Sequence, residues 1–360
     1  MKKIKLFDPL IDFQEKIAIN RVLDSKYWAS GSGEGYVKKF ENLFCNYVNS
    51  KKCIAVNSGT SALHLALSLF DIKNKEVILP SITFASTAHA ILYNGGIPIF
   101  ADIIPDTLCL DPKSVLEKLS KKTKMILPVH FAGMSCEMNE LKKIAKINNL
   151  KIVEDAAHAA GSEYKKKKIG SIGDAVCFSF HPVKNLAMPS GGAITLNGNN
   201  LKKFEELLKI RRWCGISNRI GYRYDINEIG WNFYMNEFSA SMGIVQLKKL
   251  NKMNKIRKKI AKMYSEHIEL QNKMQFDEGC SYHIYWIQVK NRNSFMKKMR
   301  ENGIETGIHY RPLHKMKLFS KKEKLPITDK VENEIVSIPI HPNLSEKDVE
   351  KIITLTNKLS

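Results

Sequence analysis

The sequence predicts an α/β protein in which a large domain with a mostly parallel β-sheet is followed by a smaller α+β domain. Short apolar segments alternate with helical segments between residues 53 and 196, which is the pattern of parallel strands connected by helices. A long helical segment over residues 235–270 ends this pattern. The chain has 360 residues, which is long enough for two domains. We therefore expect domains over residues 1–250 and 251–360.

The elements expected in the large domain follow one another in a regular order. Helices are expected over residues 60–70 and 137–147. A third helix begins at Asp111–Pro112, where an aspartate N-cap precedes a proline at the first helical position. The expected strands are short and apolar, and they are, in chain order, CIAV, EVILP, IPIFADI, KMILPVHF, LKIVEDA, DAVCFSF and GGAITLN.

The smaller domain is expected to begin after the long helix. The segment YHIYWIQV, residues 282–289, predicts a strand, and residues 293–303 predict a helix that stops at a glycine. The segment IETGIHY, residues 304–310, predicts a second strand. A final helix is expected where Ser345 and Asp348 form a capping box. The N-terminal segment is expected to join this domain.

The net charge of +21 is the strongest bias in the composition. A basic protein can bind nucleic acid or phosphorylated ligands. The lysines, however, are spread along the chain and accompany helical patterns, as over residues 245–263, where the apolar residues form a stripe. A solvated helix face explains this charge more simply than a nucleic-acid site. We expect no nucleic-acid partner, while a modest attraction for anionic substrates stays open.

The remaining composition indicates an ordinary protein of the cytoplasm. Asp8 and Asp12 interrupt the apolar residues near the N-terminus, which argues against a signal peptide. No stretch approaches the roughly 18 apolar residues that a membrane helix needs. The seven cysteines are scattered without a CxxC pair, which favours reduced thiols over disulfides or a zinc site. We expect no membrane partner and no metal.

The segment CFSFHPVKNLAMPSGG, residues 177–192, carries the most specific signal in the chain. It places Lys184 just past a strand, among apolar and aromatic residues that indicate a partly buried position. Burial lowers the proton affinity of a lysine, as a Schiff-base nucleophile and general base requires. Upstream, the strand in IVEDAAHAAG delivers Asp155 and His158. A lysine near an aspartate that keeps a pyridine nitrogen protonated indicates pyridoxal phosphate chemistry.

Each of these residues also has a purely structural interpretation. Without Lys184, Asp155 is better explained as the cap of the next helix, and His158 as a hydrogen-bonded core histidine. For His181, a position lining the site and a role in supporting a turn are equally good explanations. Residues 57–61, Asn-Ser-Gly-Thr-Ser, lie between a strand and a helix, where amides and hydroxyls form a phosphate cradle. Helix capping accounts for that segment equally well.

Together, these motifs resemble the DegT/StrS family of sugar aminotransferases, which are pyridoxal phosphate enzymes of fold type I. The resemblance covers nearly the whole chain. Its segments are, in family order, FDPLIDFQEKIAINRVLDS, GYVKKFENLFCNYV, NSGTSALHLAL, LPSITFASTAHAILYNGGIPIFADI, LPVHFAG, VEDAAHAAG, FSFHPVKN with the following GG, GWNFYMNEFSASMGIVQL, GIHYRPLH and IPIHPNLSEKDVEKI. The resemblance implies a seven-stranded, mostly parallel sheet flanked by helices, and a homodimer with composite active sites.

The family pattern implies how pyridoxal 5'-phosphate would be held by its ring. Lys184 would form the Schiff base with the cofactor aldehyde, and Asp155 would face the pyridine nitrogen. His158 would face the ring hydroxyl, where many relatives have glutamine. Phe84 matches the aromatic residue that stacks on the ring, although plain core packing explains a phenylalanine there as well.

The same pattern implies contacts to the phosphate and to the sugar. Gly59 and Thr60 would hold the phosphate with help from Ser179, and Asn232 would reach it from the partner subunit. The residues that match a segment near the sugar-binding cleft are His309 and Tyr310. Two positions depart from the pattern, because Tyr234 replaces an arginine and residues 188–192 read MPSGG where many relatives have TGEGG. Both departures bear on substrate orientation and the dimer-side wall, and neither removes the reacting groups.

The resemblance implies a cytoplasmic aminotransferase that passes the amino group of L-glutamate to a nucleotide-linked keto-deoxysugar in two half-reactions. The product would enter a surface polysaccharide, a glycan or an antibiotic. One alternative is another reaction on a nucleotide sugar, such as a dehydration in which relatives carry histidine in place of the lysine, and Lys184 argues against it. The other alternative is a regulatory or nucleic-acid-binding protein that has kept the fold.

Overall fold

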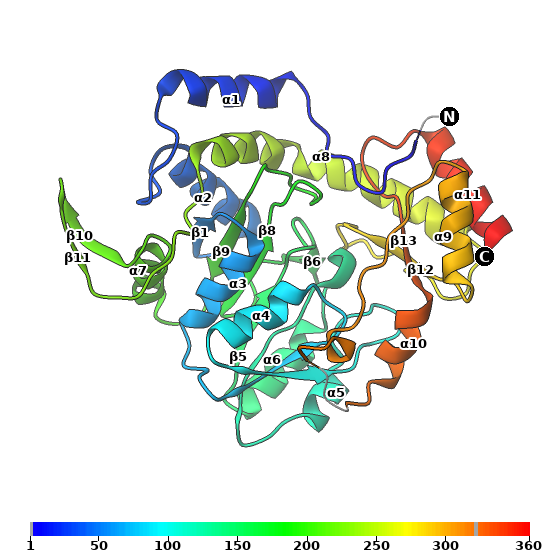
Figure 1. Cartoon of the computed structure of the whole chain (residues 1–360), viewed down its shortest axis with the longest axis horizontal. Coiled ribbons are helices and arrows are strands. Elements are labelled where there is room, and N and C mark those ends of the chain that lie inside the picture. The colour runs from blue at the N-terminus through cyan, green and yellow to red at the C-terminus, as the bar shows by residue number, and fades with distance from the viewer. Residues whose placement is uncertain (1–2, 320–322) are drawn as a thin grey trace.

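A seven-stranded sheet lies at the centre of the computed structural model, which describes residues 3–319 and 323–360 (Figure 1). The strand order is β1-β9-β8-β5-β4-β2-β3. β9 runs antiparallel to both of its neighbours, and the other strands run parallel to one another. The bounds are β1 (Lys52–Val56), β2 (Glu76–Pro80), β3 (Ile97–Ala101), β4 (Thr123–Ile126), β5 (Lys151–Asp155), β8 (Ala175–Ser179) and β9 (Gly192–Leu196). The predicted mostly parallel, seven-stranded sheet is confirmed.

Helices cover both faces of this sheet, because successive strand residues point to opposite sides. In β5, for example, Ile152 packs into one core and Val153 into the other. The helices on one face are α3 (Gly59–Ser68), α4 (Ala85–Tyr93) and α7 (Leu201–Arg211). Those on the other are α2 (Gly35–Val48), α5 (Pro112–Glu117) and α6 (Met138–Ile147). The predicted aspartate cap of α5 is confirmed, since Asp111 accepts a hydrogen bond from the Lys113 amide at 2.9 Å.

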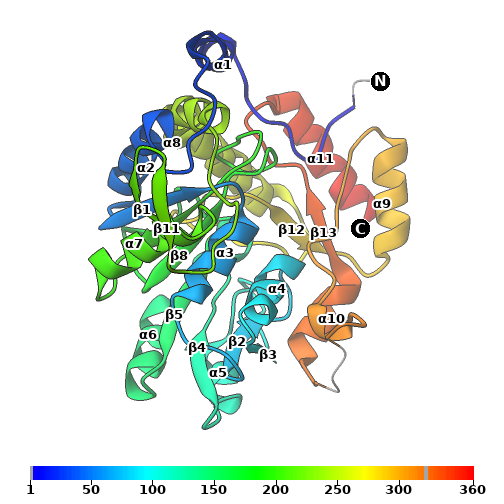
Figure 2. The same cartoon turned by 60° about the vertical axis from the view of Figure 1, so that its left-hand side comes forward.

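The long helix α8 (Glu237–His267) runs from the large sheet to the smaller part of the molecule, as both views show (Figures 1 and 2). It packs on α2 and on α1 (Phe13–Ser25). The contact with α1 includes an ion pair of 2.8 Å between Lys249 Nζ and Glu15. The predicted domain boundary after residue 250 falls inside α8, and the division of the chain at that residue stays a prediction.

The smaller part is built on two antiparallel strands, β12 (Tyr285–Gln288) and β13 (Ile335–Ile338). Its helices are α9 (Arg292–Glu301), α10 (Pro326–Glu334) and α11 (Glu346–Leu359). α11 begins at the predicted capping box of Ser345 and Asp348. The N-terminal segment joins this part, as expected, because Ile4 pairs with Ile304 in an isolated parallel bridge.

The strand predicted over residues 304–310 is wrong. This segment makes only single bridges, between Ile304 and Ile4 and between Gly307 and Ser337. It does not continue along β13 because its last residues, His309 and Tyr310, turn into the pocket described below. The strand that pairs with β12 is β13 instead.

Short elements complete the chain. They are the hairpin of β6 (Glu163–Tyr164) and β7 (Lys167–Lys168), the hairpin of β10 (Ile216–Ile220) and β11 (Arg223–Ile226), and the single turns η1 (Phe131–Gly133) and η2 (Leu313–Lys315). The β10–β11 hairpin projects away from the body of the molecule (Figure 1). None of the helices in the described residues has the length and apolar character to span a bilayer. The prediction that the N-terminal segment is not a signal peptide includes Met1 and Lys2, and these two residues lie outside the described residues.

Candidate active site

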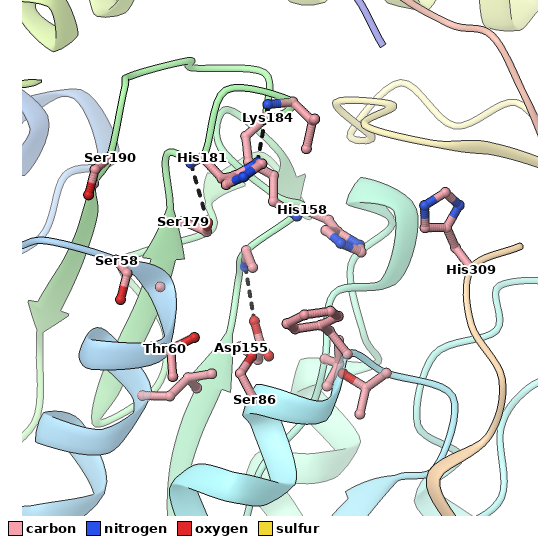
Figure 3. Close-up of a pocket in the computed structure, with 18 of the residues that line it drawn as sticks. Ser58, Thr60, Ser86, Asp155, His158, Ser179, His181, Lys184, Ser190 and His309 are labelled. Atoms are coloured by element: carbon pink, nitrogen blue, oxygen red, sulfur yellow. Dashed lines mark hydrogen bonds between the residues drawn. The ribbon is translucent and has the colours of Figure 1, made fainter. Parts of the chain in front are cut away.

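A pocket of about 470 Å³ opens at the edge of the sheet where the parallel strands end (Figure 3). Ser58 follows β1, Asp155 ends β5 and Ser179 ends β8, and all three line the pocket. Ligands of open α/β sheets bind outside the carboxyl ends of the strands, because loops of several strands converge there. The smaller part of the molecule closes the opposite side with His309 and Tyr310.

The structure brings the predicted site residues together with one exception. The predicted residues that line the pocket are Gly59, Thr60, Phe84, Asp155, His158, Ser179, Lys184, His309 and Tyr310. His181 lines it as well. Asn232 is exposed and does not line this pocket, although its carbonyl accepts a hydrogen bond of 3.2 Å from the side chain of Asn57, which does.

Lys184 lies in the loop after β8 and is held from both sides. Its amide donates a hydrogen bond of 2.8 Å to the His181 carbonyl. The next residue, Asn185, anchors the loop by donating to the Ser281 carbonyl at 2.8 Å. Burial lowers the pKa of Lys184 to about 8, and the negative charge of Asp155 opposes this shift. Lys184 therefore releases its proton far more readily than a surface lysine, while part of its surface stays accessible from the pocket.

Asp155 is buried at the end of β5. Burial raises its pKa, and hydrogen bonds from the Thr87 hydroxyl and the Ala157 amide act in the opposite direction. These bonds measure 2.7 Å to Oδ2 and 3.1 Å to Oδ1. A carboxylate in this position gains from a cationic hydrogen-bond donor in the pocket, which a protonated pyridine nitrogen supplies. The environment of Asp155 thus fits pyridoxal phosphate.

His158 is a neutral hydrogen-bond donor toward the pocket. Its Nδ1 accepts a hydrogen bond from the Ala132 amide at 3.2 Å, so Nε2 carries the proton. Nε2 lies 3.1 Å from the Tyr310 hydroxyl. Burial, followed by the charge of Lys184, holds the pKa of His158 well below its usual value. This side chain offers one N–H to an oxygen in the pocket and no positive charge.

The start of α3 lies at the pocket, as the phosphate cradle expected from the sequence requires. Ser58 caps the helix by accepting a hydrogen bond from the Ser61 amide at 3.0 Å. The first-turn amides of an α-helix have no partner within the helix and attract anions. Gly59 permits a close approach at this point, because a Cβ there would lie 2.7 Å from Ser179 Cβ. Gly192 is constrained similarly, because a Cβ would meet the Ser58 carbonyl. The cradle therefore requires both glycines.

Aromatic side chains form the outer wall of the pocket. Phe84 is 60% exposed at the start of α4, which excludes plain core packing and leaves its ring on the pocket. The Tyr310 ring lies 6.0 Å from it, between ring centroids. His309 Nδ1 forms a hydrogen bond of 2.8 Å with Ser337 Oγ. Burial lowers the pKa of His309 to about 4, and the charge of Lys184 contributes a smaller decrease. His309 is therefore neutral near pH 7.

The two departures from the family pattern have defined positions. Ser190 lines the pocket, and its hydroxyl donates a hydrogen bond to the Asn57 carbonyl. Tyr234 pairs with Val56 as an isolated bridge and is half-buried. Ser190 thus supports the loop that leads into α3, next to the phosphate cradle.

Two further residues near Lys184 have no local sequence signal for a role at the site. His283 Nε2 lies 3.4 Å from Lys184 Nζ, and Phe7 lines the pocket and stacks on the His283 ring. The local pattern around His283 predicts only a strand, and Phe7 belongs to a segment with no secondary-structure signal. Only the tertiary fold brings Phe7 to the pocket and His283 to Lys184.

The residues at the pocket fit a pyridoxal phosphate cofactor. A lysine with lowered proton affinity, a buried carboxylate, a neutral histidine donor and a helix start for the phosphate meet in one cavity. In the described residues, no group of three or more His, Cys, Asp or Glu side chains is arranged to hold a metal. The fold and this pocket define a pyridoxal phosphate-dependent enzyme of fold type I.

Comparison with known proteins gives the family. Residues 9–356 match the DegT/DnrJ/EryC1/StrS aminotransferase family, and the chain belongs to this family. It is 37% identical over 357 residues to the dTDP-3-amino-3,6-dideoxy-alpha-D-galactopyranose transaminase of Aneurinibacillus thermoaerophilus, with 96% of each chain covered. The expected enzyme class, a pyridoxal phosphate-dependent aminotransferase, is therefore confirmed.

Solved structures support the same fold. The Helicobacter pylori aminotransferase PseC, involved in the biosynthesis of pseudoaminic acid, superposes with a TM-score of 0.92 at 27% identity and 99% coverage of both chains. DesV of S. venezuelae superposes with a TM-score of 0.90 at 27% identity, covering 99% of this chain and 98% of its own. The predicted fold type I architecture is confirmed.

Proposed function

We propose that this protein transfers the amino group of L-glutamate to a nucleotide-linked keto-deoxysugar. The observation that carries the proposal is the placement of Lys184, with its lowered pKa, in one pocket with the buried Asp155. The sugar substrate is supported by the relative from Aneurinibacillus thermoaerophilus, whose name describes a transaminase of a dTDP-linked aminosugar. L-Glutamate as donor and a cytoplasmic location follow from the family resemblance.

Five groups besides Lys184 would bind and orient the cofactor. Asp155 would hold a proton on the pyridine nitrogen, and the Nε2–H of His158 would donate to the ring hydroxyl oxygen in place of its present contact with Tyr310. The amides of Gly59 and Thr60 would bind the phosphate together with the Ser179 hydroxyl. When bound, pyridoxal phosphate supplies an aldehyde and an electron-withdrawing ring that accepts negative charge from the substrate carbon.

Lys184 would hold the cofactor through Nζ and then act as the general base. With the amino donor bound, the free Nζ would take the proton from the donor α-carbon and hold it for the next proton transfer. A base of this kind typically contributes about 10²–10⁴-fold in rate. The lowered pKa suits this role, because a substantial share of the amine is neutral at pH values just above neutrality.

The alternatives from the sequence are less well supported. A dehydration in this family would place histidine where Lys184 stands, and Lys184 reaches the pocket. A regulatory or nucleic-acid-binding role would leave unexplained why the reactive groups are assembled at the strand ends. We therefore favour amino transfer.

We also propose that the protein is a homodimer with composite sites. Asn232 is exposed and lies beside Asn57 at the edge of the pocket, rather than lining it. This position is compatible with a contact to the phosphate of the partner's site, as the family pattern implies.

The test of the function is the visible absorption spectrum with pyridoxal phosphate, before and after L-glutamate. We expect a Schiff-base band that fades on addition of L-glutamate, followed by a screen of nucleotide-linked keto sugars as amino acceptors. Lys184→Ala should show no band and no turnover while keeping its fold by circular dichroism. Lys203→Ala, on the exposed face of α7, is the matched control and should behave as wild type. Substantial turnover by Lys184→Ala would refute the proposal.

A further inference from the structure

His283 lies directly against Lys184, although it comes from the smaller part of the molecule. Its Nε2 atom is 3.4 Å from Lys184 Nζ. The His283 side chain is 1% exposed, whereas Lys184 is partly exposed to the pocket, so water reaches this contact from the lysine side only. A polar contact of this kind is worth more inside the protein than at the surface, because less water competes for it.

The ring of His283 is fixed in orientation by its neighbours. It stacks on Phe7 with 5.4 Å between ring centroids, and the tilted His158 ring lies 4.6 Å from it. The backbone amide of His283 donates to the Ala132 carbonyl at 2.9 Å. A ring packed against two other rings, on a backbone fixed by a hydrogen bond, has little freedom to leave Lys184.

The loop that carries His283 is attached to the loop that carries Lys184. Asn185, next to the lysine, donates 2.8 Å to the Ser281 carbonyl and 3.0 Å to the Asn254 side chain. Ser281 in turn contacts the hydroxyl of Ser162 at 2.7 Å. The distance between Lys184 and His283 is therefore set by a network on both loops rather than by the two side chains alone.

The chemistry of the two groups decides which one donates. Burial, with the nearby charge of Lys184, holds the pKa of His283 well below its usual value, so the imidazole is neutral. A protonated lysine has three donors and no acceptor. Nε2 must then accept the hydrogen bond, and the ring proton lies on Nδ1, a buried atom with no hydrogen-bond partner among the described residues.

We propose that His283 is a positioning residue, whose Nε2 accepts a hydrogen bond from Lys184 Nζ and holds the free amine at the pocket. The inference rests on the proposed function only in taking Lys184 as the reacting amine. The proton remains on Lys184, the stronger base, and His283 supplies the site to which the amine returns whenever it is not bonded to the cofactor. An acceptor in this place stabilises the ammonium form, and so it offsets part of the effect of burial.

Other titratable groups surround this pair and act on the same equilibrium. They are Asp155, His158, His181, His309 and Arg257. All of them are still present when His283 alone is substituted, and His283→Gln, which keeps an acceptor, separates a lost hydrogen bond from a change in packing. A change in the pKa of Lys184 that His283→Gln does not share is therefore assigned to the lost hydrogen bond.

The test compares His283→Phe with His283→Gln in the full-length chain freed of cofactor. Phenylalanine keeps a ring beside Phe7 and His158 but has no acceptor, whereas the glutamine oxygen can accept from Lys184. Acetylation of Lys184, followed by mass spectrometry across pH 6.5–10, measures its pKa without any catalysis. We expect a midpoint near 8 in the wild type, a fall of about one unit in His283→Phe, and about the wild-type midpoint in His283→Gln.

A control and a second measurement complete the design. His267→Phe, at the exposed end of α8, should leave the midpoint unchanged. If His283→Phe does not fold, ¹⁵N spectra of the wild-type histidines decide the matter, since the proposal requires protonated Nδ1 and unprotonated Nε2 at His283. Equal midpoints in all variants, an upward shift in His283→Phe, or a protonated Nε2 would each overturn the proposal. Because no cofactor is present, failure to bind pyridoxal phosphate would refute the function and leave this inference standing.

Discussion

Burial shifts the pKa values of Lys184 and Asp155 in opposite directions. Desolvation disfavours the charged form of any group, so it lowers the pKa of the lysine and raises that of the carboxyl group. Their mutual attraction opposes both shifts without cancelling them. The free protein thus keeps two ionisable groups at a cost, and a bound cationic ring nitrogen would recover part of that cost at Asp155.

Replacement of Lys184 by methionine should therefore stabilise the protein while destroying its activity. The lysine has a pKa of about 8 in the folded chain against 10.5 for its ordinary value, so the unfolded state binds the proton more tightly. The penalty is complete below pH 8 and disappears as pH rises toward 10.5. Allowing for water in the pocket, we expect Lys184→Met to add about 1–3 kcal/mol at pH 7.

Urea unfolding of cofactor-free protein at pH 7 and pH 10 measures this effect. The gain of the methionine variant over wild type should shrink markedly at the higher pH. Lys203→Met, at an exposed position on α7, should change little at either pH. A Lys184→Met variant that is no more stable than wild type at pH 7 would show that the amine is not held in a desolvated site.

At the scale of elements, the pocket depends on how closely β9 approaches the start of α3. β9 is the antiparallel strand of the sheet, so it begins at the edge where the other strands end. Its first residue, Gly192, lies against the Ser58 carbonyl and the Gly59 amide with no space for a Cβ. The second glycine of the Gly-Gly pair after Lys184 is thus explained by packing at the phosphate cradle, whereas a Cβ at Gly191 would meet Met188 Sδ.

Gly192→Ala should separate β9 from α3 and weaken the binding of pyridoxal phosphate. We expect about tenfold lower affinity and a loss of about 1–3 kcal/mol in stability, typical of an overpacked site. Gly198→Ala, beyond the other end of β9, is the matched control, since its Cβ would lie 2.8 Å from the Asp174 side chain. Titration by absorbance or fluorescence should show weaker binding for Gly192→Ala alone. Equal affinities in the two variants would contradict this role.

The elements that the sequence predicted are those whose signal is local. Each sheet strand is a short apolar run, and Lys184 and Asp155 stand in motifs at strand ends, so both the sheet and the pocket's centre were accessible from the pattern. His283 was not, because it lies 99 positions from Lys184 and only the tertiary fold joins them. Residues 304–310 have a strand-like composition, but His309 and Tyr310 turn into the pocket instead of continuing along a strand. No local sequence pattern predicts this turn.

The whole molecule joins two parts around one pocket, and the proposed dimer would add a third contribution. If Asn232 serves the partner's site, subunits carrying Lys184→Ala and Asn232→Ala should complement each other. In a mixed dimer one site carries both changes and the other carries neither. Random association should then restore about one quarter of the wild-type activity, since half of the dimers are mixed and each has one intact site.

This experiment requires co-expression or joint refolding of the two variants, with each variant alone as the baseline. Light scattering should first establish that the protein is a dimer. Activity of the mixture that equals the sum of the separate variants would place Asn232 and Lys184 in the same subunit's site, or remove Asn232 from the site altogether.

The N-terminal segment has a practical consequence for anyone producing this protein. Ile4 is bridged to Ile304, and three residues later Phe7 forms part of the pocket wall and supports His283. The C-terminal residue, Ser360, instead follows α11. An affinity tag or fluorescent label is therefore better placed beside Ser360 than beside Ile4. Added or missing residues next to Ile4 would disturb Phe7 and with it the wall of the pocket.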